Sequence, residues 1–175
     1  MVLCRHGATE HNLAGAFLSR TDPPLSESGR IQCERLRTDL QRYQFARCYV
    51  SPMLRCLQTR EIVAPALPFT IEEALHEVHF GDWEGKTAEW LERHQPDELA
   101  RRRRDPATFR PPGGESFEDV AQRVRTLLER IRADGATLVI GHRGTLGVLE
   151  RLLRGLPLQS QIVRPLEPAE FHVID

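Results

Sequence analysis

Short apolar runs alternate along the chain with longer segments in which apolar residues recur every three or four positions. The short runs are typical of buried β-strands, and the helical spacing is typical of amphipathic helices. The predicted strands are Val2–Cys4, Ala46–Val50, Phe69–Ile71, Leu75–Val78, Thr137–Ile140 and Phe171–Ile174. The predicted helices run from Ser26 to Tyr43, Met53 to Val63, Thr87 to His94, Asp97 to Arg104, Ser116 to Asp134 and Leu146 to Leu153.

The order of these elements predicts an α/β fold. Strands separated by helices form right-handed βαβ units, which build a mainly parallel sheet with helices on both faces. We therefore expect a three-layer α/β/α architecture. The chain shows no internal repeat and no linker-like composition shift, and 175 residues suffice to bury about 70% of the unfolded surface. We expect one domain over residues 1–175.

Composition narrows the classes of partner. The formal net charge is −1, which gives no general attraction to nucleic acid or to membrane surfaces. The Arg101–Arg104 run is flanked by acids and lacks interleaved aromatic residues, so we interpret it as a solvated helix face. No apolar run is long enough to span a membrane, and the N-terminus does not resemble a signal peptide. We expect a cytoplasmic protein.

The cysteines do not point to a disulfide frame or to cysteine chemistry. Cys4, Cys33, Cys48 and Cys56 show no CxxC spacing and lie in apolar or helical segments, as reduced core cysteines do. None is followed six positions later by an arginine, as a cysteine phosphatase would require. The glycine-rich segment Gly81–Thr87 fails the spacing of a P-loop, so it does not predict a nucleotide site.

Chemically capable side chains gather instead at junctions between elements. Arg5 and His6 end the first predicted strand, Arg55 lies one turn into the helix after the second, and His142 follows Thr137–Ile140. The carboxyl ends of parallel strands meet at one sheet edge, where ligands bind. Guanidinium and imidazole donors around one crevice would bind a phosphate dianion without a metal.

Each of these residues alone has an ordinary structural explanation. Arg55 would pair with a surface acid, Glu77 would be an exposed strand residue, and His142 would be a satisfied histidine at a strand end. Their joint occurrence at element junctions favours a common site.

Six ordered segments carry a family resemblance. They are RHGATEHN, TDPPLSESGRIQ, SPMLRCLQT, LHEVHFGDWEG, PGGESF and GHRG, and they span nearly the whole chain. With these segments the chain resembles the histidine phosphatase superfamily, which includes the cofactor-dependent phosphoglycerate mutases. The resemblance implies a phosphoglycerate mutase-like fold and chemistry that needs neither a metal nor another cofactor in a phosphatase.

The resemblance also implies roles for individual residues. His6 would be the nucleophile that accepts the phosphoryl group, while Arg5, Arg55 and His142 would bind its non-bridging oxygens. Glu77 would protonate the leaving alkoxide and then activate water. Further substrate contacts are expected from the following residues: Gly7, Thr9, Asn12, Leu18, Ser19, Arg143 and Gly144.

Two acids near these segments are expected to be supporting residues. We interpret Glu84 as structural, bonding backbone within the Gly81–Gly85 turn. Glu115 either shapes the pocket rim or braces an arginine of the site.

Two positions depart from the pattern that relatives commonly show. Arg143 stands where a second glycine is common, and His79 stands where an acid is frequent. Neither departure touches the residues of the implied core chemistry.

The short segment from Phe80 to Gly85 resembles the phosphatase branch, which includes α-ribazole-5'-phosphate phosphatases, fructose-2,6-bisphosphatase-like enzymes and broad-specificity phosphatases. We therefore predict a phosphomonoesterase acting on a small phosphorylated metabolite, with neither nucleic acid nor membrane as partner. Phosphoglycerate mutase-type phosphotransfer and a non-catalytic phospho-ligand-binding module remain alternatives. The natural substrate and a homodimeric state are left open.

Overall fold

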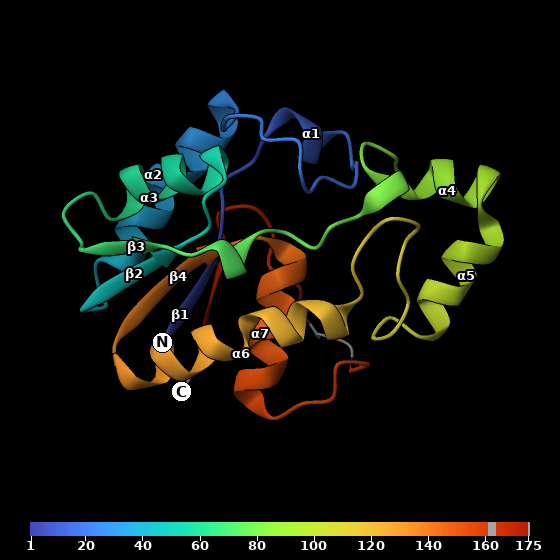
Figure 1. The fold of residues 1–175 in the computed structure, drawn as a ribbon. Coiled ribbons are helices and arrows are strands. Elements are labelled where there is room, and N and C mark those ends of the chain that lie inside the picture. The colour runs from blue at the N-terminus through green and yellow to red at the C-terminus, as the bar shows by residue number, and fades with distance from the viewer. Residues whose placement is uncertain (161–163, 175) are drawn as a thin grey trace.

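The computed structural model describes residues 1–160 and 164–174, and these contain one mainly parallel sheet (Figure 1). Its five strands are arranged in the order β3-β2-β4-β1-β5, with β5 antiparallel to β1 and the other pairs parallel. The strands are β1 (Val2–Arg5), β2 (Arg47–Val50), β3 (Phe69–Ile71), β4 (Thr137–Gly141) and β5 (Phe171–Val173). The parallel register aligns the carboxyl ends of β1, β2 and β4 at one edge.

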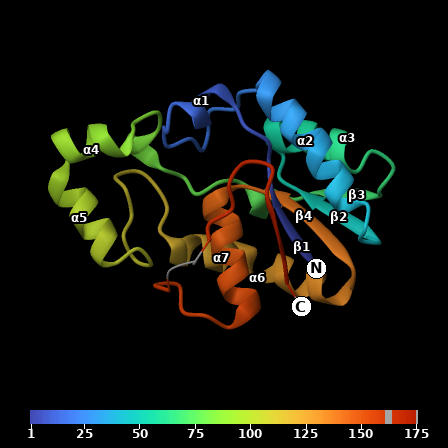
Figure 2. The same ribbon diagram turned by 180° about the vertical axis from the view of Figure 1, so that it is seen from behind.

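Helices cover both faces of this sheet (Figures 1 and 2). The helices of the described chain are α1 (Glu10–Leu13), α2 (Glu27–Leu40), α3 (Leu54–Val63), α4 (Ala88–His94), α5 (Pro96–Arg104), α6 (Phe117–Ala133) and α7 (Arg143–Arg154). Helices α2 and α3 pack on one face, and α6 and α7 pack on the other (Figure 1). The predicted three-layer α/β/α fold is confirmed.

Alternation along the strands explains the two cores. In β1, Val2 and Cys4 pack toward α2 and α3, whereas Leu3 packs toward α6 and α7. Successive side chains of a strand point to opposite faces, so a fully apolar strand serves two cores at once. This is why the strands are continuous apolar runs rather than alternating ones.

A helical arm, formed by α4 and α5, lies to one side of the sheet, and the loop after α5 leads back to the start of α6 (Figure 1). Trp83, Leu91, Leu99 and Phe109 are buried where the arm joins the larger core. The Trp83 indole donates from Nε1 to Oε1 of Gln95 at 2.7 Å, between the two arm helices. No helix within the described ranges combines the length and apolar character needed to cross a membrane.

One predicted strand is wrong. The segment Leu75–Val78 is not a strand: it follows a short 3-10 turn (Glu73–Leu75) and runs as an extended loop. The guanidinium of Arg123 donates to the carbonyls of Ala74, His76 and Glu77, which a strand would offer to a neighbouring strand. A side chain from α6 thus replaces the sheet partner.

Two helix starts also differ from expectation. Helix α1 was not predicted, because its four residues are held by the capping box of Thr9 and Asn12 rather than by an apolar stripe. Helix α7 begins at Arg143, one turn before the predicted start at Leu146. Its first free N–H groups are taken up by a carboxylate distant in the sequence, described below.

The close approach of α2 to the loop after β1 yields a stability prediction. A Cβ on Gly29 would lie 2.1 Å from the carbonyl oxygen of Ala8, so Gly29→Ala forces the helix away from that loop. Alanine normally stabilises a helix interior relative to glycine, yet here we expect a loss of about 1–3 kcal/mol in unfolding free energy. Urea unfolding measures it. Arg30→Ala, exposed on the same helix, is the matched control, and equal stability of the two variants would refute the packing argument.

Candidate active site

The first strand delivers His6 to the carboxyl edge of the sheet. Its backbone N–H donates to the carbonyl of Gly141 at 3.1 Å, which extends the pairing of β1 with β4. The side chain is buried, and its Nδ1 lies 2.7 Å from the carbonyl oxygen of Gly7. Because a carbonyl only accepts, Nδ1 carries the proton and Nε2 keeps its lone pair. This is the tautomer that a nucleophilic histidine requires.

Gly7 supplies the space for this arrangement. A Cβ at this position would lie 2.6 Å from Sγ of Cys33 and 2.7 Å from the carbonyl oxygen of Gly29. Its N–H donates to Oγ1 of Thr59 at 3.0 Å, which ties the turn to α3. Gly7 therefore packs beneath His6, against α2 and α3.

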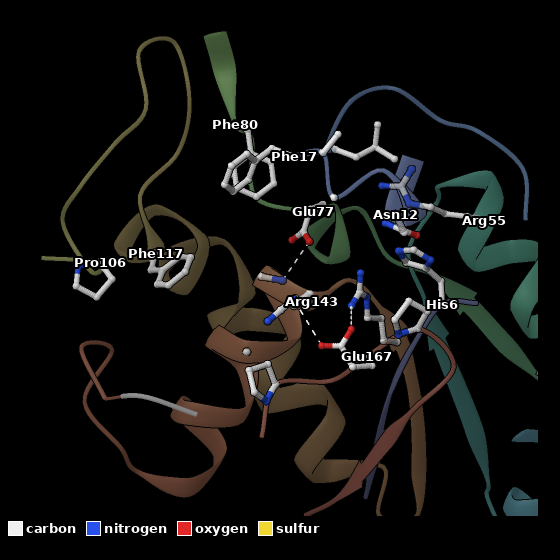
Figure 3. A pocket seen from close by; sticks show the side chains of 18 of the residues that line it. His6, Asn12, Phe17, Arg55, Glu77, Phe80, Pro106, Phe117, Arg143 and Glu167 are labelled. Carbon is white, nitrogen blue, oxygen red and sulfur yellow. Dashed lines mark hydrogen bonds and ion pairs between the residues drawn. The ribbon is translucent and has the colours of Figure 1, made fainter. Parts of the chain in front are cut away.

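Arg5, the last residue of β1, is held by the loop that precedes β5. Its NH1 donates to the carbonyl of Leu166 at 2.9 Å and lies 3.6 Å from Oε2 of Glu167. The same carboxylate lies 3.7 Å from NH1 of Arg143, so Glu167 links two arginines (Figure 3). The Glu167 side chain is 58% exposed, which makes these weak surface pairs that a ligand can replace.

Arg55 enters the site from the first turn of α3. Its NH1 donates to the carbonyl of Thr21 at 3.0 Å and forms an ion pair with Asp22 at 3.3 Å. Arg55 thus pairs with a surface acid, as an isolated arginine would, but it also lines the cavity of the site. The Nε atoms of Arg5 and Arg55 are both buried and have no hydrogen-bond partner among the described residues. Buried donors of this kind are costly unless a ligand accepts from them.

His142 follows β4 directly and is packed behind His6. The two rings are 5.1 Å apart between centroids and meet edge to face. Burial, followed by the charges of Arg55 and Arg5, holds the pKa of His6 well below its usual range. Burial, followed by Arg55 and His6, does the same to the pKa of His142. Both rings are therefore neutral near pH 7.

Ser51 is a residue of the site that the sequence interpretation missed. Its Oγ lies 2.8 Å from Nε2 of His142, and neither residue is more than 1% exposed. Its position in the sequence could have indicated this role, because Ser51 directly follows β2 just as His142 directly follows the neighbouring strand β4.

Glu77 is fixed at the N-terminus of α7. Its carboxylate accepts the backbone N–H groups of Gly144 and Thr145, each at 3.0 Å, and that of Val78 at 2.8 Å. A Cβ on Gly144 would lie 2.7 Å from Oε1 of Glu77, so the close approach depends on a glycine there. Free N–H groups and the helix dipole make a helix N-terminus a favourable place for a carboxylate.

Arg123 supports the Glu77 segment from α6 and was likewise missed. Besides the backbone carbonyls already named, its Nε donates to Oε1 of Glu115 at 3.1 Å. Glu115 in turn accepts the N–H of His79 through Oε2 at 2.9 Å. Glu115 therefore braces an arginine, but not one of the site as expected, because Arg123 does not line the cavity.

Four of these residues, Arg5, His6, Arg55 and Glu77, line one cavity of about 920 Å³ (Figure 3). Glu77 lies between its two ends (Figure 3). The inner end is lined by Arg5, His6, Asn12 and Arg55, and the outer end by Phe17, Phe80, Phe117, Pro106 and Arg102. The cavity thus offers a cationic inner end beside a lone-pair nitrogen, and an aromatic outer end.

The expected substrate-binding residues divide into two groups. Asn12, Leu18, Arg143 and Gly144 line the cavity. Gly7, Thr9, Ser19 and the buried ring of His142 are not brought to its wall among the described residues. Gly7 packs beneath His6, and Thr9 accepts the N–H of Asn12 as the cap of α1, so Asn12 is positioned by Thr9.

Ser19 is engaged by Glu84. Its Oγ donates to Oε2 of Glu84 at 2.5 Å and accepts the N–H of Phe80 at 3.2 Å. Burial raises the pKa of Glu84, but the hydrogen bonds from Ser19 and Thr21 outweigh it and leave the pKa below its usual value. We expected Glu84 to bond backbone within its own turn, Gly81–Gly85. Its partners are instead Ser19 and Thr21, in a distant loop.

Arg102 corrects the interpretation of the Arg101–Arg104 run as a wholly solvated face. Its guanidinium lies 5.3 Å from the ring centroid of Phe17, 5.5 Å from those of Phe80 and Trp83, and 6.0 Å from that of Phe117. One arginine of the run thus points inward, because consecutive helical residues face different directions.

No cluster of histidine, cysteine or acidic side chains that could hold a metal ion occurs in the parts of the chain that the structure describes. Arg5 and Arg55 bring two buried guanidinium groups to the inner end of the cavity.

Comparison with known proteins shows the family to which this chain belongs. The family described as the histidine phosphatase superfamily (branch 1) matches residues 1–175. The 2,3-bisphosphoglycerate-dependent phosphoglycerate mutase of Methylobacterium radiotolerans is 33% identical over 168 residues, covering 89% of this chain and 79% of the mutase. The adenosylcobalamin/alpha-ribazole phosphatase of Salmonella typhimurium is 31% identical over 163 residues, covering 90% of this chain and 81% of that phosphatase.

Solved structures agree with these matches. The mycobacterial glucosyl-3-phosphoglycerate phosphatase superposes with a TM-score of 0.88 at 28% identity, covering 98% of this chain and 90% of that chain.

The buried neutral histidines predict how stability depends on pH. Both folded-state pKa values lie below the unfolded value of about 6.5. At a pH between the folded-state and unfolded-state pKa values, the unfolded chain therefore binds more protons than the folded chain. The unfolding free energy is therefore complete above about pH 7 and falls as the pH drops below about 6.5. The slope approaches about 1.4 kcal/mol per pH unit for each ring.

Urea unfolding in phosphate-free buffer at pH 7.5 and pH 5.5 measures this loss. His142→Asn is expected to reduce the difference between the two pH values substantially, whereas replacing the exposed His11 by Gln leaves it unchanged. An undiminished difference in His142→Asn would show that this ring is not held neutral.

Proposed function

This chain belongs to the histidine phosphatase superfamily (branch 1) and is a phosphoric monoester hydrolase, and we propose that it hydrolyses a small phosphorylated metabolite through a phosphohistidine on His6. Glu77 is the general acid and base of this proposal, and no metal takes part. The observation that carries it is the His6 ring, which is buried and neutral and donates from Nδ1 to Gly7, so that Nε2 keeps a lone pair at the cationic end of the cavity.

In the first step Nε2 of His6 attacks phosphorus, and the bond between phosphorus and the ester oxygen breaks. The departing alkoxide takes a proton from the Glu77 carboxyl group. The guanidinium groups of Arg5 and Arg55, two residues that line the cavity, bind the non-bridging oxygens, whose charge must be stabilised as the phosphoryl group is transferred.

In the second step a water molecule attacks the phosphohistidine. Glu77 removes a proton from that water, the bond between nitrogen and phosphorus breaks, and inorganic phosphate leaves. Glu77 ends the cycle protonated and ready for the next ester. Its position between the two ends of the cavity suits it to both transfers, since the leaving oxygen and the attacking water occupy the same side of phosphorus (Figure 3).

The size and lining of the cavity support a metabolite with a substantial organic part. A volume of about 920 Å³ lies in the range of sites that enclose whole small molecules. The rings of Phe17, Phe80 and Phe117 and the guanidinium of Arg102 would contact that part. The relatives named for alpha-ribazole and glucosyl-3-phosphoglycerate hydrolysis favour substrates of this kind.

Phosphotransfer to a second substrate is the alternative, favoured by the relative named as a phosphoglycerate mutase. The same phosphohistidine would then react with a substrate hydroxyl instead of water. Release of inorganic phosphate, compared with isomerisation of 3-phosphoglycerate, separates the two outcomes. A non-catalytic phospho-ligand-binding module would show neither, because binding needs the arginines but not a nucleophile.

The nucleophile assignment predicts that His6→Ala abolishes turnover of p-nitrophenyl phosphate. It also predicts that the wild-type chain, quenched during turnover of a ³²P-labelled phosphomonoester, carries an acid-labile, base-stable label that His6→Ala lacks. His11→Ala, an exposed histidine on α1, is the control and is expected to keep both activity and label. Full turnover by His6→Ala would end the assignment, and absence of label and turnover with several phosphomonoesters would favour the binding module.

The proton-transfer assignment predicts a dependence on the leaving group. Glu77→Gln should slow an alkyl ester such as glycerol phosphate by about 10²–10⁴-fold, and p-nitrophenyl phosphate much less, because p-nitrophenolate leaves without a proton. The measurement is kcat/KM for both esters. Glu118→Gln, exposed on α6, is the control for general effects of the exchange. Equal slowing of both esters by Glu77→Gln would show that it positions the site rather than transferring a proton.

A further inference from the structure

Ser51 and His142 occupy equivalent places at the ends of neighbouring strands. Val50 pairs with Ile140 in the parallel register, and the backbone N–H of Ser51 continues the ladder by donating to the Ile140 carbonyl at 3.0 Å. The Ser51 hydroxyl then meets Nε2 of His142 at 2.8 Å. Both side chains are buried, with Ser51 0% and His142 1% exposed, so each polar hydrogen needs a partner within the protein.

The Ser51 hydroxyl has one strong acceptor available. Pro52 has no N–H, and the N–H of Met53 points at the Ser51 oxygen at 3.4 Å, where it uses a lone pair of that oxygen. Within the described residues, Nε2 of His142 is the strong acceptor for the hydroxyl hydrogen, and the sulfur of Cys56 is a weak one. The thiol of Cys56, 3.5 Å from the same nitrogen, is a second and weaker donor there.

The ring of His142 can satisfy this hydroxyl only in one tautomer. Its environment keeps the ring neutral, so it carries a single N–H. A hydrogen on Nε2 would leave the buried Ser51 hydroxyl without a strong acceptor, whereas a lone pair on Nε2 accepts from it. The ring hydrogen therefore belongs on Nδ1. The contact found for Nδ1 among the described residues is Sγ of Cys56 at 4.0 Å, a distance that leaves this N–H nearly unused.

We propose that Ser51 is a positioning residue that holds His142 as its Nδ1–H tautomer, so that the ring, which lies behind the cavity wall and 5.1 Å from the ring of His6, keeps an N–H donor for an oxygen of a phosphoryl group bound at His6. The part concerning phosphate rests on the proposed function, while the tautomer does not. His6 and His142 then carry their protons on the same ring atom and use opposite ends of the ring. His6 offers the Nε2 lone pair to phosphorus, and His142 offers the Nδ1–H to an oxygen.

The tautomer is measured directly by NMR of protein labelled with ¹³C and ¹⁵N in histidine, at pH 7.5 without phosphate. Comparison with His142→Asn assigns the His142 signals. We expect wild-type His142 to show the Nδ1–H signature, with Nε2 shifted as a hydrogen-bonded lone pair. Ser51→Ala is expected to move the signals toward Nε2–H or a mixture of tautomers. Cys56→Ala, an equally buried neighbour of the same nitrogen, should leave the Nδ1–H signature in place.

Activity supplies the second readout. Ser51→Ala should lower kcat for p-nitrophenyl phosphate about tenfold, the value of one lost hydrogen bond in the transition state. Ser51→Thr, which keeps the hydroxyl, should retain the tautomer and more of the activity.

The proposal is overturned if wild-type His142 is the Nε2–H tautomer, a result that needs no variant to fold, or if Ser51→Ala leaves the tautomer unchanged. These outcomes are independent of turnover. A chain that shows the Nδ1–H signature but forms no phosphohistidine would contradict the proposed function and leave the role of Ser51 in fixing the tautomer intact.

Discussion

The contact between the Glu77 carboxylate and the first N–H groups of α7 connects the site to the fold. It supplies the partners that a serine or threonine cap usually gives a helix, and so allows α7 to begin directly after β4. That immediate start places His142 at the strand end, beside His6. The same contact fixes the carboxylate between the two ends of the cavity, so one set of hydrogen bonds positions both a helix and the proposed proton carrier.

Burial next to two guanidinium groups decides the state of the histidines. Arg55 lowers the pKa of both rings in addition to the effect of burial, so the cations that suit phosphate also keep a lone pair on His6. In the proposed mechanism a protonated His6 could not attack phosphorus. The arrangement is stable because each neutral ring is hydrogen-bonded: His6 donates to Gly7, and His142 is bonded to Ser51.

Local patterns predicted the residues at strand ends, because a strand that stops at Arg5-His6 or just before His142 shows this in its apolar run. They did not predict contacts between distant segments. Glu77 contacts Gly144, which lies 67 positions later in the sequence. The apolar run Leu75–Val78 was predicted to be a strand because nothing in its local sequence shows that Arg123, from α6, takes the place of a neighbouring strand. Arg102 was misread because the helical periodicity of a charged run says nothing about a nearby cluster of aromatic rings.

The two ends of the cavity depend on different elements. The inner end is formed by Arg5 and His6 at the end of β1, by Asn12 of α1 and by Arg55 of α3, with Glu77 held next to them by α7. The outer end is formed by the helical arm and its aromatic neighbours, where Arg102 contacts rings rather than a carboxylate or carbonyl among the described residues. Substitutions in the arm can therefore change which organic group fits without disturbing the hydrogen bonds that prepare His6. A scaffold divided in this way can retain one phosphoryl-transfer chemistry while its substrate changes.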